Sequence, residues 1–246
     1  MSLVRIARQD GYVTLPYSKS RIDRAGDALR AHQSGESHLS YERLVEELAV
    51  VEAFRTAHAA PLTRVAANLR YYVREASGGA FVVGQRLKRV ATIRDKLERE
   101  PGMSLSRMHD VGGCRAVLPS QAAVDQALLR LRAQRRWDLL TRTWDYVAEP
   151  KREGYRAKHV VARKDGLLIE IQLRTEVQHT WAELVERLDR SLGTRLKVGQ
   201  ADASVRAVLA RGSEIMAAFE RGEIKRDATM AALRAVIAAA DQPDTS

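Results

Sequence analysis

The 246-residue sequence is poor in cysteine and in aromatic residues, and it has no long apolar run. Its single cysteine, Cys114, excludes an internal disulfide and a zinc site built from several cysteines. Aromatic residues make up 5% of the chain, which argues against a single-stranded nucleic-acid binder built on stacking platforms. No run of about 18 apolar residues occurs, and the N-terminus has too few apolar residues for a secretory signal. We therefore expect a cytoplasmic protein with no membrane partner.

Positive charge is what the chain has in excess. It carries 41 Lys and Arg against 31 Asp and Glu, a formal net charge of +10. One explanation is genome composition, because Arg far outnumbers Lys and Ala is abundant. The other is a polyanionic partner such as a nucleotide or a nucleic acid. The hydrophobic content of 45% is normal for a packed core and excludes wholesale disorder.

Hydrophobic periodicity divides the chain into three parts. Helical spacing predicts helices over 17–33, 41–57, 62–75, 89–99, 120–134, 175–192, about 201–220 and 226–240. Strand patterns occupy 80–84, 113–118, 137–143, 158–163 and 167–174. No repeat or Pro-rich linker is present, so we expect one α+β domain over 1–246. It has a central mixed β-sheet flanked by helices, with N-terminal helices over 1–78, a core over 79–193, C-terminal helices over 194–246 and a frayed tail.

The best local signal is Asp165-Gly166, which lies between two β-rich runs and predicts a two-residue hairpin turn. Such a turn pairs His159 with Gln172. Alternation along the second strand puts Glu170, Gln172 and Arg174 on one face and apolar residues on the other. The polar face therefore brings an imidazole, a carboxylate, an amide and a guanidinium within side-chain reach. An ordinary solvent-facing strand is the alternative.

A basic stripe follows the predicted strand at 80–84. If a helix begins near Leu87, then Lys88, Thr92 and Lys96 lie on one face of it, just after Arg86. Two ammonium groups and a hydroxyl in a row suit phosphate oxygens. The alternative is a solvated basic helix face.

A carboxylate and a guanidinium mark the strand at 113–118. Asp110 lies just before the strand, where a carboxylate can bind Mg²⁺, and Arg115 lies inside it. A structural Asp110–Arg115 ion pair is the alternative.

A basic loop with one aromatic ring spans 149–159. Lys151, Arg156 and Lys158 surround Gly154 and Tyr155, and such a loop can stack a base and hold its phosphates. An exposed basic loop without a ligand is the alternative.

Taken together, the order and spacing of these four groups resemble the synthetase domain of the RelA/SpoT family, the ATP-dependent pyrophosphokinases that make (p)ppGpp. The pattern R-x-K-x-x-x-S-I-x-x-K-L is matched by Arg86, Lys88, Thr92, Ile93, Lys96 and Leu97. The DYI-x-x-PK-x-x-GYR-S-x-H stretch is matched by Asp145, Tyr146, Val147, Pro150, Lys151, Gly154, Tyr155, Arg156, Ala157 and His159. The EIQ-[IL]-RT strand corresponds to residues 170–175. The resemblance covers about 80–190 and implies a nucleotidyltransferase-type core of a stand-alone small alarmone synthetase.

The resemblance also implies a reaction and residue roles. The family moves the β,γ-diphosphate of ATP to a ribose 3′-hydroxyl and uses Mg²⁺. Asp110 and Glu170 would be the catalytic, metal-holding carboxylates, with Glu170 also accepting the hydroxyl proton. Binding of ATP would involve Arg86, Lys88, Thr92, Lys96, Arg115 and Arg174. Binding of the acceptor would involve Lys151, Tyr155, His159 and Gln172.

Two acceptors are compatible with the sequence, a guanine nucleotide and the 3′ end of tRNA. Glu153 stands where the family often has Asn, and Lys158 replaces an apolar residue, so both depart from a guanine-nucleotide site. The segments 17–29 and 51–62 resemble a toxin branch that modifies the 3′-CCA end of tRNA, and the charge of +10 suits a polyanion. A candidate RNA contact patch consists of Arg130, Arg132, Arg135, Arg136 and Arg142.

We therefore slightly favour tRNA as the acceptor, with GDP or GTP as the alternative. A catalytically inert RNA-binding module is a remote third interpretation. An antitoxin partner and self-association both stay open.

Overall fold

The computed structural model describes residues 8–9, 12–13, 15–135, 138–151, 154–191 and 203–240. Two short strands near the N-terminus, β1 (Arg8–Gln9) and β2 (Tyr12–Val13), pair with each other. The remaining elements follow in chain order: α1 (Lys19–Ser34), α2 (Tyr41–Ala57), α3 (Ala59–Ser77), β3 (Val82–Leu87), α4 (Val90–Arg99), the 3₁₀ turn η1 (Leu105–Arg107), β4 (Gly112–Leu118), α5 (Gln121–Ala133), β5 (Asp138–Asp145), β6 (Lys158–Lys164), β7 (Leu167–Thr175), α6 (Glu176–Ser191), α7 (Ala203–Glu220) and α8 (Arg226–Ala240).

Five strands form the central sheet in the order β3-β4-β7-β6-β5. The β4–β7 pair is parallel and the other pairs are antiparallel, so the sheet is mixed, as the sequence predicts. The parallel pair places Gly113 beside Glu170 at the centre of the sheet. Residues just before β4 and residues in the first half of β7 therefore meet in one place.

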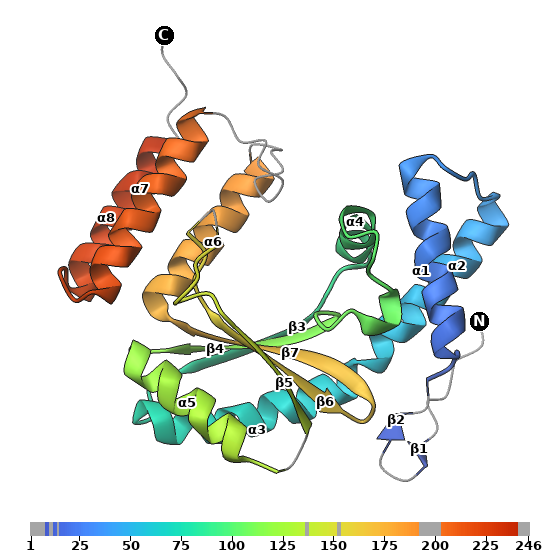
Figure 1. Cartoon of the computed structure of the whole chain (residues 1–246), viewed down its shortest axis with the longest axis horizontal. Helices are drawn as coiled ribbons and strands as arrows, with labels where there is room; N and C mark the ends of the chain where they lie inside the picture. Colours follow the sequence, from blue (N-terminus) through green and yellow to red (C-terminus); the bar gives the residue numbers. More distant parts are fainter. Residues whose placement is uncertain are drawn as a thin grey trace.

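The two faces of the sheet are covered differently (Figure 1). Helices α3 and α5 cover one face, and their apolar residues pack with Ile169, Ile171 and Leu173 of β7. On the other face, α4 with α1 and α2 stands on one side, and α6 with α7 and α8 stands on the other. Each of these two helical groups is packed around its own apolar cluster. The polar face of β7 is thus left open between them.

The helix predicted over 89–99 is confirmed as α4, but the start near Leu87 that the basic stripe assumed is wrong. Leu87 pairs with Gly112 on β4, and the Lys88 backbone N–H donates to the Val111 carbonyl at 2.8 Å. The backbone therefore stays bonded to the strand through Lys88, and the helix begins at Val90. As a result, Lys88 lies before the helix and does not share a helical stripe with Thr92 and Lys96.

The hairpin between β6 and β7 has the predicted register. His159 is paired with Gln172, and Val161 with Glu170. Asp165 and Gly166 have φ angles of 52° and 79°, which is the left-handed pair that a type I′ turn requires. Arg64 of α3 also forms an ion pair with the Asp165 carboxylate, which ties the turn to the helix beneath it.

The junction between β7 and α6 is fixed by a reciprocal cap. The Thr175 hydroxyl accepts from the Gln178 backbone N–H at 3.2 Å, and the Gln178 side chain accepts from the Thr175 N–H at 2.9 Å. This is a capping box, with Thr175 as the N-cap residue of α6.

Helices α7 and α8 pack against α6. Trp181 of α6 is completely buried in this cluster, together with Met216 and Leu233. The ring of Trp181 lies directly over Gly212 of α7, where a Cβ atom would lie 1.9 Å from two ring carbons. The close approach of α7 to α6 therefore requires glycine at this position. Among the described residues, no helix is long and apolar enough to cross a membrane.

We predict that Gly212→Ala lowers the free energy of unfolding by about 1–3 kcal/mol, the usual cost of overpacking a core. The gain in helix propensity from Ala, up to about 1 kcal/mol, does not compensate for the clash with Trp181. Urea unfolding followed by tryptophan fluorescence measures the change. Gly102→Ala is the control, because a Cβ there meets nothing within 4 Å. Equal stability of the two variants would contradict the packing described.

Candidate active site

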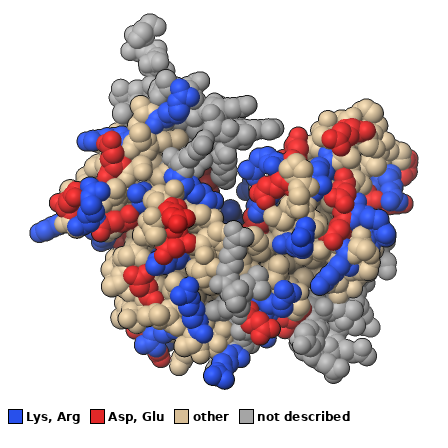
Figure 2. Space-filling view, viewed as in Figure 1, with Lys and Arg blue, Asp and Glu red and all other residues tan. Residues whose placement is uncertain are grey.

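A cavity of about 580 Å³ lies on the open face of the sheet, between α4 and α6. Figure 2 shows the corresponding hollow between the two helical groups, with Lys and Arg side chains at its walls. Its lining includes nearly every residue predicted to bind a nucleotide or metal: Arg86, Lys88, Lys96, Asp110, Arg115, Lys151, Tyr155, His159, Glu170, Gln172 and Arg174. Thr92 is the exception, because it is exposed on α4 and does not line the cavity.

Glu170 is buried at the centre of this cavity and is held from both sides. His159 Nδ1 lies 3.0 Å from Glu170 Oε1, and Gln172 Nε2 donates to Glu170 Oε2 at 2.6 Å. Burial alone would raise the pKa of Glu170, but its hydrogen bond and charge interaction with His159, together with the Gln172 hydrogen bond, lower the pKa to about 2. Glu170 is therefore an ionised carboxylate at neutral pH.

The hydrogen bonds around Glu170 close into a ring. The Tyr155 hydroxyl lies 2.6 Å from His159 Nε2, and Arg174 Nη2 donates to the same hydroxyl at 2.6 Å. Arg174 Nη2 also donates to Gln172 Oε1 at 2.5 Å. Burial raises the pKa of Tyr155 to about 12, so its hydroxyl keeps its proton. His159 thus faces Glu170 through Nδ1 and the Tyr155 hydroxyl through Nε2.

Asp110 is the second carboxylate of the cavity. Lys88 Nζ lies 2.9 Å from Asp110 Oδ2, and Lys96 Nζ lies 3.0 Å from Asp110 Oδ1. Burial would raise the pKa of Asp110, but the two ammonium groups lower it to about 2. Lys88 and Lys96 thus meet at Asp110 although they do not share a helical stripe. The alternative ion pair with Arg115 is not formed, because Arg115 lies beside Glu183, at 3.6 Å.

Two arginines and two glycines form a flat surface beside the carboxylates. In the β3–β4 register, Gly84 lies opposite Arg115 and Arg86 lies opposite Gly113. Arg86 and Arg115 therefore project from the same face of the sheet, on a diagonal. The glycines add no side chain between them, so a planar ring has room against the two guanidinium groups.

An aromatic wall completes the cavity, and the sequence analysis did not assign it to the site. His109 and Trp144 are stacked, with ring centroids 5.2 Å apart and an interplanar angle of 21°. Tyr146 lies edge-on to His159, and Lys151 Nζ sits 4.5 Å above the Tyr146 ring. The available signal was alternation along β5, because Trp144 is paired with His159. Arg99, Met103 and Glu186 also line the cavity and gave no sequence signal.

The candidate RNA patch lies elsewhere. Arg130 of α5 forms an ion pair with Glu75 of α3, and Arg132 donates to the Thr143 hydroxyl at 3.1 Å. Both helices cover the face of the sheet opposite the cavity. Arg135 is exposed after α5, Arg136 lies outside the described residues, and the Arg142 side chain is not described. Glu153, which bears on guanine recognition, is also outside the described residues.

The donor set fits a hard divalent cation shared with a substrate. Asp110 and Glu170 are ionised carboxylates that line the same cavity, and they influence each other electrostatically. Among the described residues, no group of three His, Cys, Asp or Glu side chains could hold a metal ion alone. Mg²⁺ commonly binds through one or two carboxylates and completes its shell with water and substrate phosphates.

We predict that Asp110→Asn flattens the acid side of the stability curve of the protein in the presence of a chelator. The folded pKa of Asp110, about 2, is below its ordinary value of 3.8. Its stabilising contribution is therefore present above pH 3.8 and is lost as the pH falls towards 2. Between pH 5 and pH 2, the wild type should lose about 2 kcal/mol more unfolding free energy than the variant. Parallel curves in urea titrations would contradict the pairing of Asp110 with the two lysines.

Comparison with known proteins agrees with this geometry. A family model described as the region found in RelA / SpoT proteins matches residues 85–188. GTP pyrophosphokinase YjbM of Bacillus subtilis (strain 168) is 28% identical over 202 residues, which cover 75% of this chain and 87% of that protein.

Solved structures show the same fold. Small alarmone synthetase 2 of Bacillus subtilis superposes with a TM-score of 0.60 at 19% identity, covering 70% of this chain and 95% of that chain. Small alarmone synthetase 1 of the same organism, bound to its product pppGpp, has a TM-score of 0.53 at 25% identity, covering 71% and 98%. Residues 85–188 therefore match the region found in RelA/SpoT proteins, and the chain has the fold of the small alarmone synthetases.

Proposed function

We propose that this protein is a (p)ppGpp-type pyrophosphokinase, which moves the β,γ-diphosphate of ATP to the ribose 3′-hydroxyl of GDP or GTP and releases AMP. The observation that carries the proposal is the pairing of two ionised carboxylates, Asp110 and Glu170, inside one cavity rich in Lys and Arg. The similarity to a GTP pyrophosphokinase and to a synthetase bound to pppGpp supports the nucleotide acceptor.

The adenine of ATP would lie against Arg86 and Arg115. A guanidinium is planar and stacks well on an aromatic base, and these two side chains project from the same face of β3 and β4. Lys88, Lys96 and Arg174 would then meet the phosphates. Each ammonium group has three N–H donors, so its ion pair with Asp110 leaves donors for phosphate oxygens.

Asp110 and Glu170 would hold Mg²⁺, which neutralises charge on the transferred phosphates. The proton-acceptor role that the sequence analysis gave to Glu170 is weak, because a carboxylate with a pKa of about 2 is a poor base at neutral pH. Phosphoryl transfer depends mainly on positioning and electrostatic stabilisation. We therefore assign Glu170 to holding the metal and aligning the attacking hydroxyl.

The acceptor would enter beside the segment 149–157, named here the acceptor loop, of which 152–153 are not described. Tyr155 and Lys151 line the cavity at this loop, and Lys151 Nζ lies 5.3 Å from the centre of the Tyr155 ring. Tyr155 would stack on the acceptor base, and the hydrogen bonds of its hydroxyl to His159 and Arg174 fix the plane of the ring. The ring around Glu170 thus connects the acceptor side of the cavity to the metal side.

The 3′ end of tRNA is the second candidate acceptor. The net charge of +10 favours a polyanion, and the cavity opens into a wide hollow between the two helical groups (Figure 2). Against it, Arg130 and Arg132 lie on the far face of the sheet, where they cannot extend the cavity. We therefore place guanine nucleotides first, which reverses the slight preference drawn from the sequence.

We predict that γ-labelled ATP with Mg²⁺ transfers its label to GDP or GTP when the protein is present. Deacylated tRNA, incubated in parallel, should stay unlabelled. Label on tRNA alone would overturn the nucleotide acceptor and establish the second candidate. Absence of label on any of the three would overturn the enzymatic proposal.

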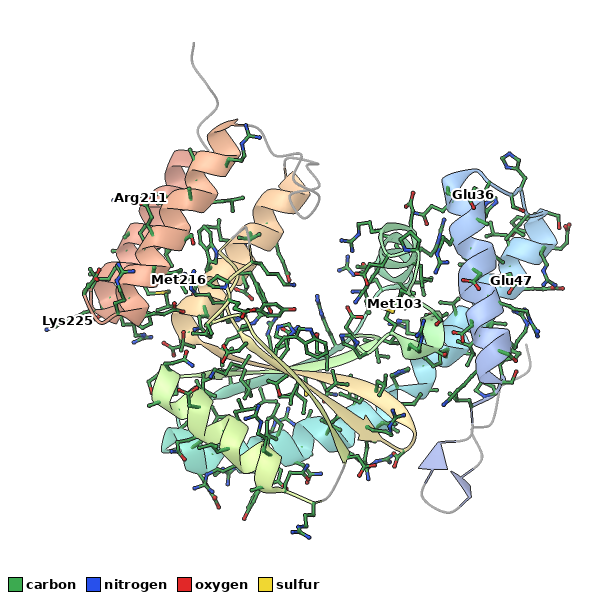
Figure 3. All side chains as sticks on the ribbon, in the orientation of Figure 1. Glu36, Glu47, Met103, Arg211, Met216 and Lys225 are labelled. Carbon is green, nitrogen blue, oxygen red and sulfur yellow. The ribbon has the colours of Figure 1, made fainter. Side chains whose placement is uncertain are left out.

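We also predict that Glu170→Gln reduces transfer by about 100- to 1,000-fold, the usual cost of removing one electrostatic contact to a transition state. The substitution keeps the shape of the side chain and removes its charge. Glu36→Gln is the matched control, because Glu36 is exposed at the far end of α1, away from the sheet (Figure 3). Circular dichroism and Tm verify folding. A Glu170→Gln variant with the control's activity would refute the assignment of this carboxylate.

A further inference from the structure

Helix α7 reaches the acceptor loop from the outside of the molecule. Its Gly212 packs on Trp181 of α6, and Met216 lies buried between α7 and α6 (Figure 3). The next residue after Gly212 is Ser213, which faces the acceptor loop: a Cβ atom on Gly154 would lie 2.8 Å from Ser213 Cβ. Gly154 also has a φ angle of 68°, which favours glycine. The backbone of the loop is therefore seated directly on α7.

Glu220, the last residue of α7, holds two partners with one carboxylate. Its Oε2 lies 2.7 Å from Arg156 Nε in a buried ion pair, and its Oε1 accepts from Gln178 Nε2 at 3.1 Å. Both side chains are largely buried, with 7% and 17% of their surface exposed.

The two partners of Glu220, Arg156 and Gln178, support different parts of the cavity. Arg156 Nη1 donates to the Gly154 carbonyl at 3.2 Å. This hydrogen bond joins the two residues that flank Tyr155. Gln178 forms the capping box with Thr175, the residue that follows Arg174 at the end of β7. Tyr155 and Arg174 are themselves hydrogen-bonded. Glu220 thus connects Arg156, which holds the loop at Tyr155, to Gln178, which caps the helix after Arg174.

We propose that Glu220 is a positioning residue for the acceptor: through Arg156 it fixes the acceptor loop, and through Gln178 it fixes the loop relative to the end of β7. The inference rests on the proposed function and deepens it, because it gives the C-terminal helices a part in the reaction. Glu220 touches no substrate in this scheme. It sets the position of Tyr155, which does.

The alternative is that the Glu220–Arg156 pair only stabilises the fold. Burial raises the pKa of Glu220, and Arg156 and Gln178 offset only part of this shift. A carboxyl whose folded pKa is raised is more easily protonated in the folded protein than in the unfolded chain, so its negative charge does not stabilise the fold at neutral pH. A neutral isostere at this position keeps the volume of the side chain and releases Arg156, so its effect on the acceptor loop can be measured beside its effect on stability.

The first test is steady-state kinetics of Glu220→Gln with ATP and the acceptor identified by the labelling assay. We expect the KM for the acceptor to rise about tenfold, while kcat and the KM for ATP stay within about twofold. Glu214→Gln is the matched control on the same helix, because Glu214 is 67% exposed and pairs with Arg211, which points away from α6 (Figure 3). This control should leave every parameter unchanged.

The second test is hydrogen–deuterium exchange of the acceptor loop without substrates. Glu220→Gln should speed exchange across 149–157, and Glu214→Gln should not. This measurement needs no acceptor. It therefore reports whether Glu220 stabilises the loop even if the wild-type protein transfers no label and the proposed function fails. Unchanged loop exchange, or an equal rise of both KM values together with a lower Tm, would overturn the positioning role.

Discussion

Burying an ionised carboxylate in the middle of a sheet costs free energy unless donors surround it, and this constraint organises the whole site. Glu170 meets it through His159 and Gln172, which are in turn fixed by Tyr155 and Arg174. Because the ring is closed, no member can rotate without breaking two contacts. The carboxylate is therefore rigid before any ligand arrives, which is the preorganisation that electrostatic catalysis requires.

The unequal cover of the sheet provides the space for this network. The apolar side of β7 is covered by α3 and α5, while its polar side lies between the two helical groups. Asp110 comes to the same space because the segment before β4 lies beside the start of β7. The parallel pair β4–β7 thus determines both the position of the two carboxylates and the place of the cavity.

The sequence was sufficient to predict the hairpin and its polar face, because Asp165-Gly166 fixes the register and alternation fixes the side of each residue. It could not predict that Lys88 continues the strand, since the backbone bond from Lys88 to Val111 is a tertiary contact without a local signal. Both the assumed helical stripe and the family pattern placed Thr92 in the site, whereas Thr92 is exposed on α4. Trp144 and His109 were missed because their stacking joins two separate segments. Glu220 was missed for the same reason, being the end of an otherwise ordinary helix.

The parallel pairing of β4 with β7 also determines when the site can exist during synthesis. β5 and β6 lie between them in the chain, and β7 is inserted between β4 and β6. A nascent chain that ends after β4 contains Asp110, Lys88 and Lys96 but lacks Glu170. Non-local strand pairs form late because their loops must close first. Incomplete chains are thereby prevented from consuming nucleotide before the last central strand is in place.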